Sequence, residues 1–352
     1  GSEMCIRDRA VNSATSALHI ACLALGLGKG DWLWTSPITF VASANCGVYC
    51  GAQVDFVDID ARTYNLCPKA LAIKLEKAER EGRLPKVVIA VHLCGQSCDM
   101  QTIQALSQKY GFKIIEDASH GIGGKYQGEF IGCGRFSDIT VFSFHPVKII
   151  TTAEGGMALT NCPKLAEQMD LLRSHGITRD KQRMTHAPDG PWYYQQIDLG
   201  FNYRMTELQA ALGVSQLERL DKFVARRHEI AQRYNRLLAD MPVTIPWQYP
   251  DSYSGMHLYV IRLQLGDINR SHLEVFESLR EQKVGVNLHY IPIHTQPFYK
   301  AMGFNSRQFP QAIAYYQEAI SLPMFHSMTD EQQNHVISSL KNALDVSKEE
   351  NN

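Results

Sequence analysis

The chain has 352 residues, and its 35 lysines and arginines nearly balance its 36 aspartates and glutamates. This length suits about two domains, or one large α/β domain with a smaller appendage. The balanced charge provides no basic surface for a nucleic acid or an anionic membrane. The sequence also contains no apolar run near the about 20 residues that span a bilayer, and no export signal. We therefore expect a cytoplasmic protein whose partners are small molecules or proteins.

The nine cysteines lie in apolar or loop contexts and lack the short paired spacings of a disulfide framework. This usage fits reduced thiols in a reducing compartment. The nearest approach to a metal-ligand cluster is Cys94 and Cys98 close to His92, but the spacing CGQSC differs from that of a zinc site. We assign no metal site to the sequence.

A helix is predicted over residues 13–27, where small polar residues precede apolar residues at helical spacing and glycines follow. The free amides at its N-terminus, with the hydroxyls of Ser13, Thr15 and Ser16, form a site suited to a phosphate. The same residues also suit an ordinary N-cap. The residues ahead of this helix show no recognisable pattern, so we expect that the natural start of the protein is missing or replaced.

The next segment predicts a parallel sheet. A strand over Trp32–Thr35 leads through Pro37 into a helix and then into a strand at 53–57. Phe40 stands at the start of that helix, where its ring stacks on a planar ligand or packs in the core. The alternation continues with a helix at 70–82, a strand at 87–96, a helix at 100–110 and a strand at 112–120.

Asp117 stands where the strand at 112–120 stops. In an open α/β sheet, ligands gather at the carboxyl ends of the strands. We therefore expect Asp117 to share a crevice with Lys148, which follows a later strand. His120 comes shortly after Asp117 and either contacts the same ligand or is a hydrogen-bonded loop histidine.

The apolar run VFSF at 141–144 predicts a buried strand, and Lys148 lies just beyond its end. Pro146 stiffens the loop that carries this lysine, and Ile149 and Ile150 follow it. In these surroundings we expect the amine to be partly desolvated, which turns an ammonium group into a usable nucleophile. The alternative is a surface lysine whose stem covers apolar surface.

Around this strand, the sequence predicts a glycine-rich hairpin at 123–138, a strand at 155–161 that pairs with VFSF, and a helix at 162–175. Residues 177–194 are polar but contain three aromatic residues, and we interpret them as a mobile or substrate-facing loop. A long helical region follows and ends at Pro242.

Two domains are expected, a large one over residues 10–241 and a smaller C-terminal α+β domain over residues 242–352. The smaller domain is predicted to contain a strand at 257–265, a helix at 271–282, a strand and loop at 284–294, and helices around Pro310 and Asp330.

Four features now coincide: a phosphate-ready helix start, an aromatic residue after the next strand, an acid at a strand end, and a lysine after a strand that contains a serine. Together they describe a pocket for pyridoxal phosphate. The lysine amine reacts with the cofactor aldehyde, the carboxylate keeps the pyridine nitrogen protonated, and the phosphate anchors the other end.

The motifs NSATSALH, TSPITFVASAN, EDASHGIGGKYQG, FSFHPVKIITTAEGGM, RSHG and GFNYRMTELQAALG occur in this order. Through them, nearly the whole chain resembles the DegT/DnrJ/EryC1/StrS family of nucleotide-sugar aminotransferases. Within the family, HPVK, ITT, EGG and the SATSAL start are most similar to the UDP-4-amino-4,6-dideoxy-N-acetyl-β-L-altrosamine transaminases of pseudaminic acid biosynthesis. Relatives carry a longer segment ahead of the SATSAL helix, and we expect this chain to lack it.

The resemblance implies fold type I of the pyridoxal-phosphate enzymes. This is an α/β fold whose large domain surrounds a mostly parallel seven-stranded sheet and whose smaller C-terminal domain is α+β. It also implies a homodimer with shared active sites, in which Asn202 reaches the phosphate bound by the other subunit.

The resemblance assigns roles to individual residues as well. Lys148 binds the cofactor and moves the proton, Asp117 pairs with the pyridine nitrogen, and Phe40 stacks on the ring. His120 contacts the ring or its hydroxyl group. The remaining implied contacts are those to the cofactor phosphate from Ala14, Thr15, Ser16 and Ser143.

The implied reaction has two halves. L-glutamate, the expected donor, gives its amino group to the cofactor, and the 4-keto group of a UDP-linked 4-keto-6-deoxy-N-acetylhexosamine then receives it. Residues 177–194 and 287–294 are candidates for substrate contacts, the latter through Tyr290 and His294. Two alternatives stay open: an aminotransferase for another nucleotide-linked keto-sugar, forming perosamine or a 3-amino sugar, and a non-catalytic homologue that keeps the fold.

Overall fold

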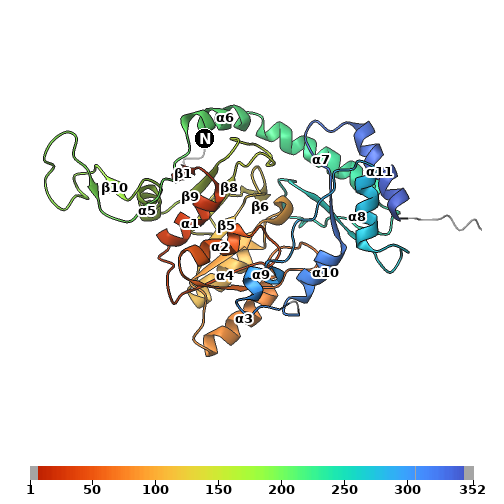
Figure 1. Cartoon of the computed structure of the whole chain (residues 1–352), viewed down its shortest axis with the longest axis horizontal. Coiled ribbons are helices and arrows are strands. Elements are labelled where there is room, and N and C mark those ends of the chain that lie inside the picture. Colours follow the sequence, from red (N-terminus) through yellow and green to blue (C-terminus); the bar gives the residue numbers. More distant parts are fainter. Residues whose placement is uncertain (1–6, 306, 345–352) are drawn as a thin grey trace, which may run out of the picture.

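A computed structural model describes residues 7–305 and 307–344, and its centre is a seven-stranded sheet (Figure 1). In the order of the sheet, the strands are β1 (Arg7–Val11), β9 (Gly156–Thr160), β8 (Ile139–Ser143), β5 (Lys113–Asp117), β4 (Val87–Val91), β2 (Trp32–Thr35) and β3 (Gln53–Phe56). Neighbours from β8 to β3 are parallel, whereas β9 is antiparallel to both β8 and β1. The expected mostly parallel seven-stranded sheet is therefore confirmed.

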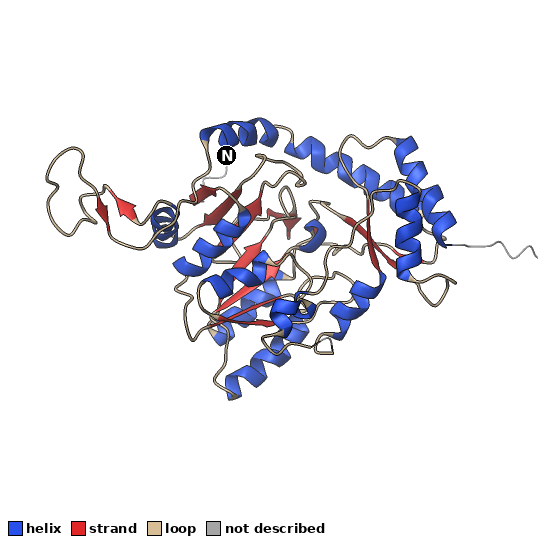
Figure 2. Cartoon of the chain, in the orientation of Figure 1, coloured by secondary structure: helices blue, strands red, loops and turns tan. Residues whose placement is uncertain are grey.

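Helices cover both faces of this sheet, as Figure 2 shows: α1 (Ala14–Ala24), α2 (Ala42–Tyr49) and α5 (Pro163–Arg173) on one face, and α3 (Pro68–Arg80) and α4 (Met100–Tyr110) on the other. Val87, Ile89 and Val91 of β4 pack with the first group. Val88 and Ala90 pack with the second. This alternation is the two-residue period of a strand, and burial on both faces explains why β4 is apolar throughout.

A second hydrophobic core surrounds a smaller antiparallel sheet, whose strands are β12 (Val243–Thr244), β14 (Tyr259–Leu263) and β15 (Ala319–Leu322). The helices in this core are α8 (His272–Glu281), α11 (Asp330–Leu344) and the C-terminal part of α7 (Leu220–Leu237). By contrast, Tyr299 of α9 (Pro297–Lys300) and Tyr315 of α10 (Pro310–Glu318) pack in the core of the large sheet. The division of the chain at residue 242 stays a prediction.

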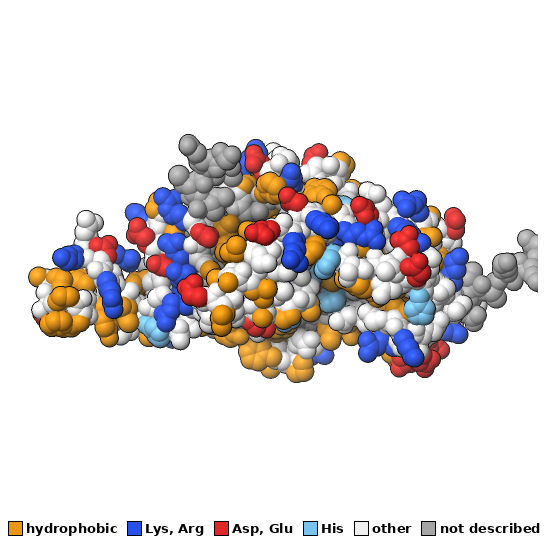
Figure 3. Space-filling model, turned by 90° about the horizontal axis from the view of Figure 1, so that it is seen from above, with side chains coloured by type: hydrophobic (Ala, Val, Ile, Leu, Met, Phe, Trp, Pro, Cys, Tyr) orange, Lys and Arg blue, Asp and Glu red, His pale blue; other side chains and the backbone are white. Residues whose placement is uncertain are grey.

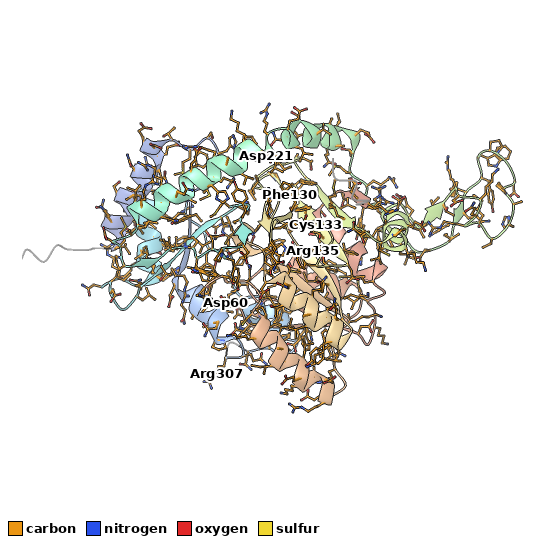
Figure 4. All side chains as sticks on the ribbon, turned by 180° about the vertical axis from the view of Figure 1, so that it is seen from behind. Asp60, Phe130, Cys133, Arg135, Asp221 and Arg307 are labelled. Carbon is orange, nitrogen blue, oxygen red and sulfur yellow. The ribbon has the colours of Figure 1, made fainter. Side chains whose placement is uncertain are left out.

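The predicted glycine-rich hairpin consists of β6 (Lys125–Tyr126) and β7 (Glu129–Phe130), and β6 also pairs with β13 (Ser252–Tyr253). Phe130 ends β7, Cys133 and Arg135 belong to the segment that leads from the hairpin to β8, and Figure 4 shows all three below Asp221 of α7. Ile131 of the same segment packs in one cluster with apolar residues of α7. The segment after the hairpin thereby packs against both the large sheet, through Phe142 of β8, and the long helix α7.

An arm, residues 177–196, projects from the body of the molecule (Figure 1). The short strands β10 (Ile177–Thr178) and β11 (Gln195–Gln196) pair at its base, and α6 (Glu207–Leu217) follows the arm in the sequence. The interpretation of residues 177–194 as a loop therefore holds for the tip of the arm but not for its base.

The sequence missed one strand, and one expected strand is wrong. Residues 7–11 form β1 although their sequence RDRAV shows no strand pattern, because β9 provides a complete antiparallel ladder for them. Residues 284–294 do not form a strand, and Asn287 makes only an isolated bridge to Ser321. Gly285 and Pro292 explain this, since glycine weakens a strand and proline lacks the amide that a ladder needs.

Within the part of the chain that the structure describes, every helix is too short or too polar to cross a membrane. The described cysteines all carry free thiols. No group of three or more His, Cys, Asp or Glu side chains among the same residues is suited to hold a metal ion.

Candidate active site

A cavity of about 360 Å³ lies where the carboxyl ends of β4, β5 and β8 meet the start of α1. Its lining includes Val91, Asp117 and Ser143, which are the last residues of these three strands. The parallel register pairs Asp117 with Val91 on one side and with Val141 on the other, so the strand ends are nearly level. The cavity therefore occupies the position where open α/β sheets bind their ligands.

Lys148 reaches this cavity from the loop between β8 and β9. The neighbouring Ile149 and Ile150 are buried in an apolar cluster, which anchors the loop. Burial lowers the pKa of the Lys148 amine from 10.5 to about 8, and the Asp117 carboxylate opposes this shift. The expected desolvation is therefore confirmed, and an appreciable fraction of the amine is unprotonated near neutral pH.

Asp117 is buried, and hydroxyl and amide donors hold its carboxylate. Oδ1 accepts hydrogen bonds from the Ser119 amide (3.1 Å) and the Ser119 hydroxyl (2.5 Å). Oδ2 accepts one from the Ser43 hydroxyl (2.7 Å). Hydrogen bonds to a charged group are short and strong, so Asp117 is a fixed acceptor in the cavity wall.

The N-terminus of α1 forms another wall, through Ser13, Ala14 and Thr15. The first amides of a helix have no partner within the helix, and the helix dipole favours an anion beside them. Gly156 permits the close approach of α1 to β9, since a Cβ at that position would lie 2.5 Å from the Ala14 nitrogen. This wall suits a phosphate group.

Aromatic rings form a further wall. Phe40 has 57% of its surface exposed, and its ring centre lies 6.2 Å from that of Tyr290. The Tyr290 hydroxyl lies 3.1 Å from Nε2 of His120. Nδ1 of His120 accepts from the Cys94 amide (3.3 Å), so in the neutral ring Nε2 carries the proton and donates to Tyr290. Burial, assisted by Lys148, holds the pKa of His120 well below its usual value.

The structure brings most of the predicted site residues to this one cavity: Ala14, Thr15, Phe40, Asp117, His120, Ser143, Lys148 and Tyr290. Ser16 is not among them. Its amide donates to the Ser13 hydroxyl (3.1 Å), and its own hydroxyl donates to Asn12 (2.6 Å). Both of its donors therefore serve the cap of α1 and not the cavity.

Two other predicted residues also lie elsewhere. His294 is completely buried, with its ring centre 4.8 Å from that of Phe309 and 6.5 Å from that of Phe56, so it does not reach the cavity. Asn202 is exposed and lies outside the cavity of its own chain. Its expected phosphate contact is therefore not made within this chain.

Sequence reasoning missed several residues of the cavity, namely Thr39, Ser43, Ser119 and Glu154. A signal for Thr39 and Ser43 was present, because hydroxyl side chains spaced i, i+4 at the start of a predicted helix lie close together. Glu154 comes to the site through the loop of Lys148, where its Oε1 lies 3.8 Å from Nε2 of His145. Asn287 and His289 line the cavity and belong to the predicted substrate segment 287–294.

The residues of the cavity fit pyridoxal phosphate. The start of α1 suits its phosphate, the exposed ring of Phe40 suits its flat ring, and the Asp117 carboxylate suits a protonated ring nitrogen. The Lys148 amine, with its lowered pKa, suits the aldehyde. The fit needs all four groups in one cavity, and all four are present there.

Known proteins resemble this chain over nearly its whole length. Residues 2–341 match the DegT/DnrJ/EryC1/StrS aminotransferase family. The spore coat polysaccharide biosynthesis protein SpsC of Bacillus subtilis is 38% identical over 338 residues, which are 95% of this chain and 85% of that protein.

Solved structures share the fold. PseC of Helicobacter pylori, an aminotransferase involved in the biosynthesis of pseudaminic acid, is 31% identical with a TM-score of 0.85, and the match covers 96% of this chain and 86% of that one. Spr1654 of Streptococcus pneumoniae in its PMP form is 28% identical with a TM-score of 0.85, covering 96% of this chain and 87% of that one. The same Streptococcus protein has also been solved in its PLP form. The chain thus belongs to the DegT/DnrJ/EryC1/StrS aminotransferase family and is a sugar aminotransferase that depends on pyridoxal phosphate.

Proposed function

We propose that this enzyme transfers the amino group of L-glutamate to the 4-keto carbon of a UDP-linked 4-keto-6-deoxy-N-acetylhexosamine, within pseudaminic acid biosynthesis. The observation that carries the reaction type is the single cavity lined by Lys148, Asp117 and the start of α1. The choice of sugar is supported by the 31% identity to PseC across 96% of the chain. We also propose that the enzyme works in the cytoplasm, since the free thiols of the described cysteines suit a reducing compartment.

Pyridoxal phosphate, when bound, supplies the electron sink for the carbon that loses or gains a proton. In our proposal Lys148 carries that proton on Nζ, taking it from the donor and returning it on the path to the product. A pKa of about 8 suits both directions, because such an amine exchanges protons readily near neutral pH. Asp117 holds a proton on the ring nitrogen, and Phe40 covers one face of the ring.

The remaining groups orient the bound molecules. The amides of Ala14 and Thr15, with the Ser143 hydroxyl, hold the phosphate end. Tyr290 stands between Phe40 and His120, where its hydroxyl is fixed by His120 and its ring faces the cavity. We propose Tyr290 as a contact of the sugar substrate.

We further propose a homodimer with shared active sites. α6 has no buried residue and exposes Leu208 (86%), Val214 (65%) and Leu217 (55%). The arm also presents apolar atoms, seen at the left end of the molecule in Figure 3, and Trp192 is 73% exposed. Large exposed apolar patches mark protein interfaces. A second copy that covers them also accounts for the exposed position of Asn202.

A second candidate is an aminotransferase for a different nucleotide-linked keto-sugar. The observation in its favour is the 38% identity to SpsC, which is described as a protein of spore coat polysaccharide biosynthesis. The two candidates share the chemistry at Lys148 and differ only in the sugar and nucleotide.

The test is a panel of UDP-, GDP- and dTDP-linked 4-keto and 3-keto sugars, each assayed for kcat/KM with L-glutamate as donor. We expect the UDP-linked 4-keto-6-deoxy-N-acetylhexosamine to be preferred by at least about tenfold, with NMR of the product locating the new amine at C4. Preference for a GDP- or dTDP-linked sugar contradicts the proposed substrate and supports the second candidate. No turnover with any sugar, and no change of the cofactor spectrum with L-glutamate, contradicts the proposed catalytic function altogether.

A further inference from the structure

Asp117 accepts more hydrogen bonds from its own chain than a carboxylate needs in order to pair with a single cation. Each carboxylate oxygen has two lone pairs that can accept hydrogen bonds. The Ser119 amide and hydroxyl occupy both acceptor positions of Oδ1. The Ser43 hydroxyl occupies one position of Oδ2. Among the described hydrogen bonds, the acceptor position left open on Asp117 is therefore the second lone pair of Oδ2.

The number of protons on each hydroxyl also determines which group donates in each hydrogen bond. The Ser43 hydroxyl has one proton, and it donates this proton to Oδ2 of Asp117. The Thr39 hydroxyl lies 2.9 Å from the Ser43 hydroxyl, so Thr39 must be the donor in that contact. The hydrogen bonds thus run in one direction, from Thr39 through Ser43 to Asp117.

Water cannot take the place of the Thr39 and Ser43 hydroxyls, because both of these side chains and Asp117 are buried. Thr39, Ser43 and Asp117 are 3%, 0% and 4% exposed. Thr39 and Ser43 flank Phe40 in the segment that enters α2, and all four residues line the cavity. The same short segment therefore carries the ring that faces the cofactor and the hydroxyls that hold Asp117.

We propose that Thr39 and Ser43 are positioning residues that aim the open lone pair of Asp117 Oδ2 at the ring nitrogen of the cofactor. This inference rests on the proposed placement of that nitrogen at Asp117. Ser43 fixes the carboxylate through Oδ2, and Thr39 fixes the direction of the Ser43 hydroxyl. Neither residue touches the reacting atoms.

A purely structural role for the two hydroxyls makes a different prediction. Buried hydroxyls need partners in any case, so Ser43 and Thr39 could serve only to join α2 to β5. Loss of either hydroxyl would then weaken every ligand of the cavity equally. A positioning role weakens only ligands that possess the ring nitrogen.

The experiment compares two cofactors on the apoenzyme: pyridoxal phosphate and its 1-deaza analogue, in which a C–H group replaces the ring nitrogen. Dissociation constants are measured by spectroscopic titration. We expect the wild type to bind pyridoxal phosphate about 100-fold more tightly than the analogue, and Ser43→Ala to reduce this ratio to about tenfold. The affinity for the analogue itself is expected to stay within about twofold of the wild-type value.

Thr39→Val provides a second variant of nearly equal side-chain volume, in case Ser43→Ala folds poorly, and should lower the ratio about threefold. Thr35→Val is its matched control. Thr35 is also completely buried, but its hydroxyl donates to the Ile89 carbonyl (3.1 Å) and not toward Asp117. We expect this control to keep the wild-type ratio.

The proposal is overturned if Ser43→Ala and Thr39→Val both keep the wild-type ratio, or if both cofactors lose affinity equally. A wild type that binds the two cofactors equally overturns it in another way, because the ring nitrogen then does not lie at Asp117. That result refutes the proposed placement of the cofactor, whereas the first two refute only the role of the hydroxyls.

Discussion

The cavity wall differs from the surface formed by α6 and the arm in how completely the rest of the chain covers its side chains and provides partners for them. At the cavity, Asp117 and Ser43 are 4% and 0% exposed, and the Ser43 hydroxyl donates a short hydrogen bond to Asp117. On the outer surface, Leu208 and Trp192 are 86% and 73% exposed. The hydrogen bonds that hold Asp117 are therefore made within one chain, whereas the apolar surface is covered only in the proposed homodimer.

The comparison separates two kinds of substitution. A change in the cavity wall should damage the chemistry while leaving the oligomeric state unchanged. A change on α6 should weaken the homodimer. It should affect the chemistry only because the partner subunit is then lost.

The largest effect is expected from Lys148→Ala. Removal of the amine takes away the cofactor link and the group that moves the proton, so transamination should fall by about 10⁴-fold. Lys164→Ala is the matched control, because Lys164 is exposed on α5 and does not line the cavity. Steady-state kinetics with L-glutamate measures the effect, and full transamination by Lys148→Ala would refute the assignment.

Asp117→Asn should have the next largest effect, a loss of about 100-fold in kcat. The amide is neutral and no longer stabilises a proton on the ring nitrogen, so the cofactor stays bound but is a weaker electron sink. L-glutamate deuterated at Cα measures the step directly, since a larger isotope effect shows that proton abstraction has become slower. Wild-type turnover by this variant contradicts the role of Asp117.

Substitutions on α6 test the other side of the comparison. The double variant Leu208→Asp, Val214→Asp places charges on the exposed face of α6 and should raise the dissociation constant of the homodimer by about 30-fold or more. Ile73→Asp on α3 is the matched control, because Ile73 is 70% exposed outside the proposed interface. Sedimentation velocity gives the oligomeric state, and an unchanged assembly in the double variant argues against α6 as the interface.

The smallest effect concerns pH. Burial places the pKa of Lys148 at about 8, below its ordinary value of 10.5, so the reactive free amine becomes the major form above pH 8. The rate at which the apoenzyme captures pyridoxal phosphate should therefore rise about fivefold between pH 7 and pH 8 and then level off. Stopped-flow absorbance follows this capture. A rate that continues to rise towards pH 10 would mean that the amine is not desolvated.

The fold and the core of the site could be predicted because their signals are local. Asp117 and Lys148 each follow an apolar strand, and parallel strands bring such residues to one edge of the sheet. β1 could not be predicted, since its pairing comes from β9 and not from its own sequence. His294 lies outside the cavity for a similar reason, because Phe56 from a distant part of the chain packs with Phe309 around its buried ring.

The most direct test of the central claim is to locate the cofactor on the chain. The enzyme loaded with pyridoxal phosphate is treated with borohydride, which makes the covalent link permanent, and its peptides are identified by mass spectrometry. We predict one labelled residue, Lys148, with the label lost in Lys148→Ala and kept in Lys164→Ala. A label on another lysine, or bound cofactor that leaves Lys148 unlabelled, would contradict the account.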